Sequence, residues 1–452
     1  MAVITNKLKK QVIDSIKTDF DNASNRYYIG LGKSEQFNTA DTVPDALNHD
    51  FEERTFRNAL QAIMEVSDFT FVVERENWSA GTKYSAYNDK QVANPNPSYY
   101  VMNDENQVYI CIQQGKNANG DVVNSTVKPT GEATSILSTG DGYLWKFLYS
   151  ISAASANKFV SANFIPVKLQ GATDSSSPAA DIKQLAIQTA AVAGQIVGYE
   201  VLDGGSGYTS APTITIIGDG TNASAVASIS GGEVSKVEIN FSGSPTPVAQ
   251  LGSGYKNASI TVTGGGGSGA IVRPIFGTKS GLGSNPIIDL RSTAVMFTVK
   301  PTGAQGTDFI IGNKFRQVGL LRNPLVSEGG AAFSDPTGSA LRKLTLATKT
   351  VDFTIGETIT GVNEAKAIID AIDSATGKIL SYHQNEDTGY KDFIVSNNIN
   401  GASGGRGVSA GTGPITAAEF GTTTGEVLYI DNRAAVTRSA EQTEDIKIVI
   451  QI

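Results

Sequence analysis

Cysteine and histidine are nearly absent from this chain of 452 residues. Cys111 is the only cysteine, which excludes an internal disulfide and any site built from several thiolates. The two histidines, His49 and His383, have no second histidine or cysteine at ligand spacing, so no zinc site is expected. A Ser-His-Asp or Cys-His triad would have to use one of these two histidines, and we do not expect one.

Basic runs and long apolar runs are also missing. Aspartate and glutamate total 44 against 36 lysines and arginines, a net charge of −8, and no run of Lys or Arg exceeds a pair. A nucleic-acid-binding surface needs clusters that neutralise phosphates, so nucleic acid is not an expected partner. No window approaches the roughly 20 apolar residues of a membrane span, and the first ten residues lack the apolar segment of a signal peptide. We therefore expect synthesis in a cytoplasm and no membrane partner.

No local pattern predicts a catalytic residue, a cofactor or a metal ligand. Gly30–Ser34 ends like a phosphate-binding loop, but Tyr27 stands where that motif needs glycine, and no helix is expected after Ser34. Acidic residues of the Gly-rich region, such as Asp203 and Asp219, fit no EF-hand and are interpreted as solvated turn residues. A glycosidase pair stays open, because any two of the 44 acids could meet in space. We nevertheless predict that the protein is not an enzyme.

The chain does contain a dense aromatic strand. Gly140-Asp141-Gly142 leads into Tyr143–Ile151, whose odd positions are all large and apolar while its even positions are mixed. A period of two is typical of a strand with one strongly buried face. Four aromatic residues fall in this stretch, although aromatics are only 8% of the chain. We therefore expect the strand to anchor a core or an interface.

Composition predicts a mainly β fold with minor α, an α+β class, because Gly numbers 48 residues and charged residues are only 18%. Amphipathic helices are expected over residues 6–20 and 50–66, the second with a capping box of Asp50 and Glu53. A chain of this length should hold several domains or inserted modules. Two regions rich in small residues, 173–280 and 344–414, are the candidates for inserted β-modules.

The first of these regions contains an internal repeat. Gly205-Ser-Gly-Tyr208 recurs as Gly252-Ser-Gly-Tyr255, an offset of 47 (252 − 205), and each copy leads into a strand-like run, 213–217 and 258–262. Internal repetition of this kind predicts a small β-module whose units bury their faces against each other. Gly231–Val234 is a plausible hairpin connection between its strands.

Six segments act as landmarks along the chain: Tyr28–Glu35, Val72–Trp78, Gly140–Ile151, Lys314–Leu325, Leu428–Arg433 and Gln442–Ile452. In this order, and with the last as a terminal strand, they resemble the baseplate wedge subunit family of contractile-tailed, T-even-like bacteriophages, specifically its wedge protein eight. The resemblance covers about residues 20–170, 285–345 and 415–452. It leaves out both Gly-rich regions, which resemble β-repeats inserted in many phage tail proteins.

The resemblance implies a structural, non-enzymatic protein of the virion tail baseplate, assembled in the host cytoplasm and needing no cofactor. It also implies a homodimer within each wedge and contacts with other baseplate wedge proteins. The implied architecture is a β-sandwich core with flanking α/β lobes and inserted Gly-rich β-repeat modules. The predicted division is an N-terminal α/β and β-sandwich part (1–172), the repeat module (173–280), core sandwich strands (281–343), a second inserted β-module (344–414) and C-terminal core strands (415–452).

Tyr, Trp and Arg tend to carry the binding energy of protein interfaces. The candidate interface residues are therefore Arg75, Trp78, Trp145, Arg316 and Arg433, and a role in stabilising the fold is at least as well founded for each. A receptor- or glycan-binding tail protein, with the repeat module as its adhesive part, is the alternative function, and a tail-associated glycan hydrolase is a third. The adhesive alternative predicts exposed aromatics in the repeat, where only Tyr208 and Tyr255 qualify.

Overall fold

The structure is a computed structural model, and it describes residues 4–244, 247–301, 309–439 and 444–452. Strands make up 40% of the chain and helices 11%, which confirms the predicted mainly β fold with minor α. The helices of the described residues are α1 (Asn6–Phe20), α2 (Asp50–Ala59), α3 (Ala153–Phe159), α4 (Ala179–Thr189) and α5 (Pro286–Asp289).

The chain divides into two compact units, each discontinuous in sequence. Unit 1 holds the chain up to Ile13 together with Thr70–Met296 and Ile450–Ile452, and unit 2 holds Asp14–Phe69 and Phe297–Val449. The boundaries fall inside α1 and inside three strands, β3 (Asp68–Glu74), β19 (Ala294–Val299) and β30 (Ile446–Gln451). The five-part division expected from the sequence stays a prediction.

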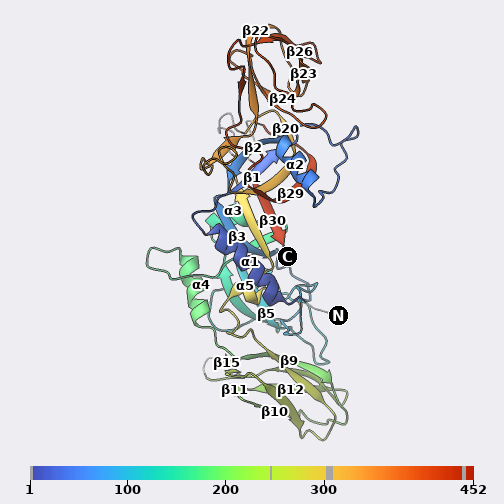
Figure 1. Cartoon of the computed structure of the whole chain (residues 1–452). Coiled ribbons are helices and arrows are strands. Elements are labelled where there is room, and N and C mark those ends of the chain that lie inside the picture. The colour runs from blue at the N-terminus through green and yellow to red at the C-terminus, as the bar shows by residue number, and fades with distance from the viewer. Residues whose placement is uncertain (1–3, 245–246, 302–308, 440–443) are drawn as a thin grey trace. The chain divides into compact units, whose positions relative to one another are not determined.

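One part of unit 2 is a five-stranded antiparallel sheet covered by α2 (Figure 1). Gly30 lies opposite Gly319 on neighbouring strands, and a Cβ built on Gly319 would come within 2.2 Å of the Phe56 ring. This glycine pair leaves the depression that receives Phe56 of α2, which is fully buried. The order is β21-β2-β1-β20-β29, with β1 (Tyr27–Gly32), β2 (Leu60–Glu65), β20 (Lys314–Arg322), β21 (Thr337–Ser339) and β29 (Glu426–Thr437).

The helix predicted over residues 50–66 is wrong in its second half. α2 ends at Ala59, and Leu60–Glu65 forms β2, which pairs with β1 on one side and β21 on the other. A short apolar run such as Leu60-Gln-Ala-Ile63 fits a buried strand as well as a helix, and pairing on both edges decides for the strand. The predicted capping box is also wrong by one residue, because His49 is the N-cap and its Nδ1 accepts the Glu52 N–H at 3.0 Å.

Helix α1 forms over the predicted residues, but its apolar stripe is only partly buried. Ile13 is fully buried, whereas Leu8 is 50% exposed and Val12 is 42% exposed. Phe20 at the end of the helix stacks on Phe69 within unit 2, with ring centroids 5.2 Å apart. The stripe is therefore buried at Ile13 and largely exposed at Leu8 and Val12.

The other part of unit 2 is a closed antiparallel barrel. The strand order is β25-β24-β23-β26-β27-β22-β28, and a further pairing of β25 with β22 closes six of these strands into a ring. Closure removes the free edges that make open sheets prone to association. A single apolar cluster, which includes Leu344, Ile369 and Leu380, forms its core. The strands are β22 (Arg342–Val351), β23 (Thr358–Gly361), β24 (Lys366–Ile372), β25 (Ile379–His383), β26 (Asn398–Gly401), β27 (Arg406–Ser409) and β28 (Ile415–Thr416).

The aromatic strand is β7 of unit 1, in a sheet of order β4-β5-β7-β6. Trp145 is fully buried and stacks on Tyr143 with ring centroids 5.7 Å apart. The even positions are buried as well, including Lys146, which donates to the Thr134 carbonyl, so two faces are buried where one was expected. The strands are β4 (Tyr100–Met102), β5 (Gln107–Gln113), β6 (Leu137–Ser138) and β7 (Leu144–Ser150), and β8 (Phe164–Val167) pairs with β3.

The Gly-rich region of unit 1 folds as two repeats that pack on each other reciprocally. Its strands pair as β9 (Ile196–Asp203) with β18 (Ile271–Phe276), β10 (Thr213–Gly218) with β17 (Ala258–Thr263), β11 (Thr221–Ala223) with β16 (Leu251–Ser253), β12 (Ala225–Ser230) with β13 (Glu233–Ile239), and β14 (Phe241–Ser242) with β15 (Val248–Ala249). The predicted hairpin around Gly231 is the β12–β13 connection and is confirmed.

The contacts between the two repeats occur in equivalent pairs, which are related by the 47-residue offset of the sequence. Gly267 lies against the ring of Tyr208 in the first repeat, and Gly220, its equivalent, lies against the ring of Tyr255 in the second. Each tyrosine is buried, with 4% of Tyr208 and 7% of Tyr255 exposed. Each repeated motif therefore completes its packing on the turn that follows the strand of the other repeat, as expected for units that bury their faces together.

This packing predicts that Gly267→Ala and Gly220→Ala destabilise the module similarly. A Cβ would stand 2.6 Å from the Tyr208 ring at Gly267 and 2.4 Å from the Tyr255 ring at Gly220. Overpacking of this kind costs about 1–3 kcal/mol, and hydrogen exchange of β10 and β17 would report it. Gly171→Ala is the matched control, because its Cβ meets nothing within 4 Å. Equal exchange in all three variants would contradict the reciprocal packing.

Candidate functional site

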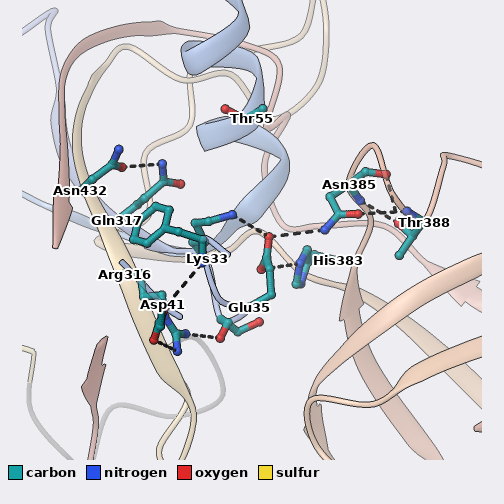
Figure 2. A network of polar contacts seen from close by, with 12 residues as sticks. Lys33, Glu35, Asp41, Thr55, Arg316, Gln317, His383, Asn385, Thr388 and Asn432 are labelled. Atoms are coloured by element: carbon teal, nitrogen blue, oxygen red, sulfur yellow. Dashed lines mark hydrogen bonds and ion pairs between the residues drawn. The ribbon is translucent and has the colours of Figure 1, made fainter. Parts of the chain in front are cut away.

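The candidate site is a polar network around His383 in unit 2 (Figure 2). Lys33 and Glu35 lie in the segment that follows β1, and His383 is the last residue of β25. Asp370 lies on β24, where the pairing with β25 shifts register between Ile369 and Ala371. Such a bulge re-aims the side chain of the extra residue. The site thus joins one segment beside the five-stranded sheet to two strands of the barrel.

The imidazole of His383 is held between two carboxylates. Its Nδ1 lies 2.5 Å from Asp370 Oδ2, and its Nε2 lies 3.2 Å from Glu35 Oε2. The second contact is an ion pair without the alignment of a hydrogen bond, so neither of its atoms has a hydrogen-bond partner. Asp370 is fully buried and His383 is 4% exposed.

Further polar groups complete the surroundings of both carboxylates. Asn313 Nδ2 donates to Asp370 Oδ1 at 3.2 Å, and Gln61 Nε2 lies 3.5 Å from the same oxygen. Lys33 Nζ donates to Glu35 Oε1 at 3.1 Å, and Asn385 Nδ2 lies 3.4 Å from that oxygen. Buried charges persist when they are paired and hydrogen-bonded. Each charged group of this network is paired and makes at least one hydrogen bond, while the contact of His383 Nε2 with Glu35 Oε2 is an ion pair alone.

The carboxylates keep the histidine charged. Burial by itself lowers the pKa of His383, but Asp370 and Glu35 outweigh burial and raise that pKa from 6.5 to about 10. Burial would raise the pKa of Glu35, but His383 and Lys33 hold it well below its ordinary value. At neutral pH the site therefore holds an imidazolium at His383 beside an ionised Glu35.

This arrangement is suited to holding two parts of the fold together through ion pairs, and not to catalysis by the histidine. A histidine that acts as a general base offers a free ring nitrogen to a nucleophile, whereas both ring nitrogens of His383 face carboxylates. With a pKa of about 10, the His383 imidazole stays protonated near neutral pH and does not take up a proton there. We interpret the network as a set of ion pairs that holds the segment with Glu35 against the barrel strands with Asp370 and His383.

A second anchor holds the same segment. Arg316 of β20 donates to both carboxylate oxygens of Asp41. Its Nε lies 2.8 Å from Oδ1 and its Nη2 lies 2.7 Å from Oδ2. It also donates to the Ser34 carbonyl. Arg316 is 2% exposed, and planar two-point pairing of this kind is strong and directional. The segment that carries Glu35 is therefore fixed to the sheet as well as to the barrel.

The network predicts a loss of stability at alkaline pH. Because the folded-state pKa of His383 is raised, its stabilisation is complete below pH 6.5 and is lost as pH rises toward about 10. Glu35 has a lowered pKa, so its share is lost as pH falls below about 4.5. Hydrogen exchange of β24 and β25 should show opening between pH 7 and 10, after correction for intrinsic exchange. The same pH dependence in His383→Gln would contradict this assignment.

Comparison with models of protein families finds no match. Comparison with curated protein sequences also finds none.

Two stretches have Gly-x-Ser-x-Gly spacing, Gly401–Gly405 and Gly407–Gly411. A nucleophile elbow places its serine between a strand and a helix. Ser403 instead lies in the turn between β26 and β27, and Ser409 is a fully buried strand residue that donates to the Ile394 carbonyl at 2.6 Å. Neither serine therefore lies between a strand and a helix, as a nucleophile elbow requires.

The structure distributes the five candidate interface residues over both units. In unit 1, Trp145 is core, Trp78 is half-buried and packs on the same cluster, and Arg75 donates to the Ser161 carbonyl at 3.0 Å. In unit 2, Arg316 is the buried anchor described above, and Arg433 is exposed beside Asp431. Direct roles in an interface stay predictions for all five.

No group of three or more potential metal-ligating side chains occurs within the described ranges. Among the helices of the same ranges, none is long and apolar enough to cross a membrane. Gly30 and Gly32 of the sequence that ends like a phosphate loop are strand residues of β1, and Lys33 pairs with Glu35.

The residues of the His383 network were missed in the sequence. One signal was available, because Asp370 interrupts the apolar run Ala367-Ile-Ile-Asp-Ala-Ile372 of β24. A lone acid in a buried strand needs a partner, and this need could have been linked to one of two histidines. Nothing in the sequence indicates that Glu35 is the other partner.

Proposed function

We propose that this protein is a structural subunit of a contractile phage tail baseplate, where it joins neighbouring wedge proteins as a homodimer and helps hold the assembly before contraction. The observation that carries this proposal is the placement of three of the landmark segments. Tyr28–Glu35, Lys314–Leu325 and Leu428–Arg433 contribute β1, β20 and β29, which are consecutive strands of one sheet. Segments far apart in the sequence thus form one continuous scaffold.

The His383 network supports the same proposal. An assembly protein that transmits load needs inserted modules fixed to its scaffold, and ion pairs buried in the fold give that connection a defined geometry. Lys33 and Glu35, which contact the barrel residue His383, belong to the first landmark segment. The barrel is therefore attached to the part of the chain that carries the family resemblance.

The adhesive alternative loses its main support. It needs aromatic side chains exposed on the repeat, and the tyrosines of the repeated motif, Tyr208 and Tyr255, are both buried. Their rings pack on glycines of the opposite repeat, which is a role in the fold. The surface that remains on β10 and β17 is made of threonine, serine and isoleucine.

Native mass and co-assembly test the proposed function. We expect the purified protein to be a dimer and to enter a defined complex when it is combined with the wedge proteins of the same phage. Antibody labelling of virions should then mark the baseplate. A stable trimer that binds host surface glycans and ignores the wedge proteins would overturn the proposal. Glycan cleavage that depends on two neighbouring carboxylates would overturn it in favour of a hydrolase.

A further inference from the structure

Unit 1 contains an open cavity of about 680 Å³. Its walls are the loop Ser85–Gln91, the end of β5 with the residues that follow it to Lys116, and parts of β9 and β13. Concave sites of roughly 300–1,000 Å³ are typical for small ligands. Most neutral side chains on these walls carry hydroxyl or amide groups, among them Ser85, Asn88 and Gln114.

The charges around the cavity are paired except for one. Glu200 contacts Lys90 at 3.1 Å and Arg273 at 2.9 Å. Arg273 also contacts Asp89 at 2.7 Å. The remaining carboxylate of the wall, Glu238, contacts Lys236 at 2.7 Å.

Lys116 is left over from this pairing. The walls carry two cations, Lys90 and Lys116, and two carboxylates, Glu200 and Glu238, and both carboxylates already contact other cations. Lys116 has no ion pair or side-chain hydrogen bond to any residue of the described ranges, and it is half-buried. Burial lowers the pKa of Lys116, and the Glu238 carboxylate, which makes no direct contact with it, offsets this only in part.

We propose that this cavity binds a carboxylate-bearing ligand of monosaccharide size, such as a uronic acid, with the Lys116 ammonium as the group that receives the carboxylate. The hydroxyl and amide groups on the walls suit the hydroxyls of a sugar ring. A carboxylate there gives Lys116 a direct partner and gains a charge-assisted hydrogen bond in a partly dehydrated site. The proposal is independent of the proposed assembly function.

Calorimetric titration of the full-length protein with glucuronate tests this site, with glucose as the neutral counterpart. We expect glucuronate to bind at least about tenfold more tightly than glucose, since a charge-assisted hydrogen bond contributes about 1.5–3 kcal/mol. Lys116→Gln should remove this preference and Lys116→Arg should retain most of it. Lys256→Gln is the matched control, because Lys256 is an exposed lysine of the same unit outside the cavity.

Three outcomes would overturn the proposal. One is equal affinity for glucuronate and glucose, and another is an unchanged preference in Lys116→Gln. The third is binding of an acidic peptide, such as acetyl-Asp-Asp-amide, without binding of glucuronate, which would assign the cavity to a protein side chain. If Lys116→Gln fails to fold by circular dichroism, the retained preference in Lys116→Arg and the salt dependence of glucuronate binding to the native protein decide. In that case an affinity independent of salt overturns the proposal.

Discussion

Asp370→Asn is expected to lower the free energy of unfolding of unit 2 by about 3–5 kcal/mol, because removal of one partner leaves a buried charge without compensation. Asp370 is fully buried, and its two oxygens accept from different donors. An asparagine has one oxygen, so its amide nitrogen must face either His383 or Asn313, and each of these presents an N–H group. Either orientation places a donor against a donor.

The control for this change is Asp387→Asn, because Asp387 is an exposed aspartate in the same part of unit 2 and lies outside the His383 network described above. We expect it to change stability by less than about 0.5 kcal/mol, as surface substitutions usually do. Urea unfolding together with hydrogen exchange of β24 and β25 would separate the barrel from the rest of the protein. If the two variants behave alike, the buried ion pairs do not hold the barrel. Glu35→Gln should have an intermediate effect, because Glu35 is partly exposed and also pairs with Lys33.

The sequence predicted local structure well where the pattern lies within a single helix, hairpin or repeat. The helix Asn6–Phe20 and the hairpin connection at Gly231 are found where the sequence placed them. The repeat was visible as a sequence offset, and the structure adds that its copies complete each other across that offset. These features depend on residues close in sequence or on exact repetition.

Features that depend on distant pairing were not predictable from one sequence. Leu60–Glu65 became β2 because β1 and β21 supply partners on both edges, and no local pattern contains that information. Glu35 and His383 lie 348 residues apart in the sequence (383 − 35) and are brought together only by the tertiary structure. A single buried acid, Asp370, was the only local indication that a buried cation was needed.

A substitution in the Gly-Asp-Gly turn before the aromatic strand is the second change for which we expect a large loss of stability. The Asp141 carboxylate accepts from the backbone N–H groups of Thr126 and Val127 at 2.7 and 2.9 Å through one oxygen. Its other oxygen accepts from the Thr139 hydroxyl at 2.5 Å. Gly142 has a φ of +84°, a conformation in which glycine is preferred. The motif is therefore a junction that joins the segment at Thr126 to the start of β7.

Asp141→Asn is expected to lower the free energy of unfolding by about 2–4 kcal/mol. Hydrogen bonds to a charged group contribute about 1.5–3 kcal/mol each, and water replaces part of them. The asparagine can keep one set of bonds, and its amide nitrogen then faces the donors of the other set. Hydrogen–deuterium exchange should rise at residues 125–127 and 139–143, with little change in the Gly-rich repeats.

Asp121→Asn is the matched control for this prediction. Asp121 is exposed, and its carboxylate accepts from the side chain of Asn117 at 3.0 Å, a bond that an asparagine oxygen can keep. Burial would raise the pKa of Asp141, but the Thr139 hydroxyl and the two backbone N–H groups lower it below 3.8. The stabilisation is therefore present above pH 3.8 and is lost as pH falls below it, so the difference between Asp141→Asn and the native protein should shrink in acid. A difference that stays constant down to pH 2 would show that the carboxylate charge is not what holds the junction.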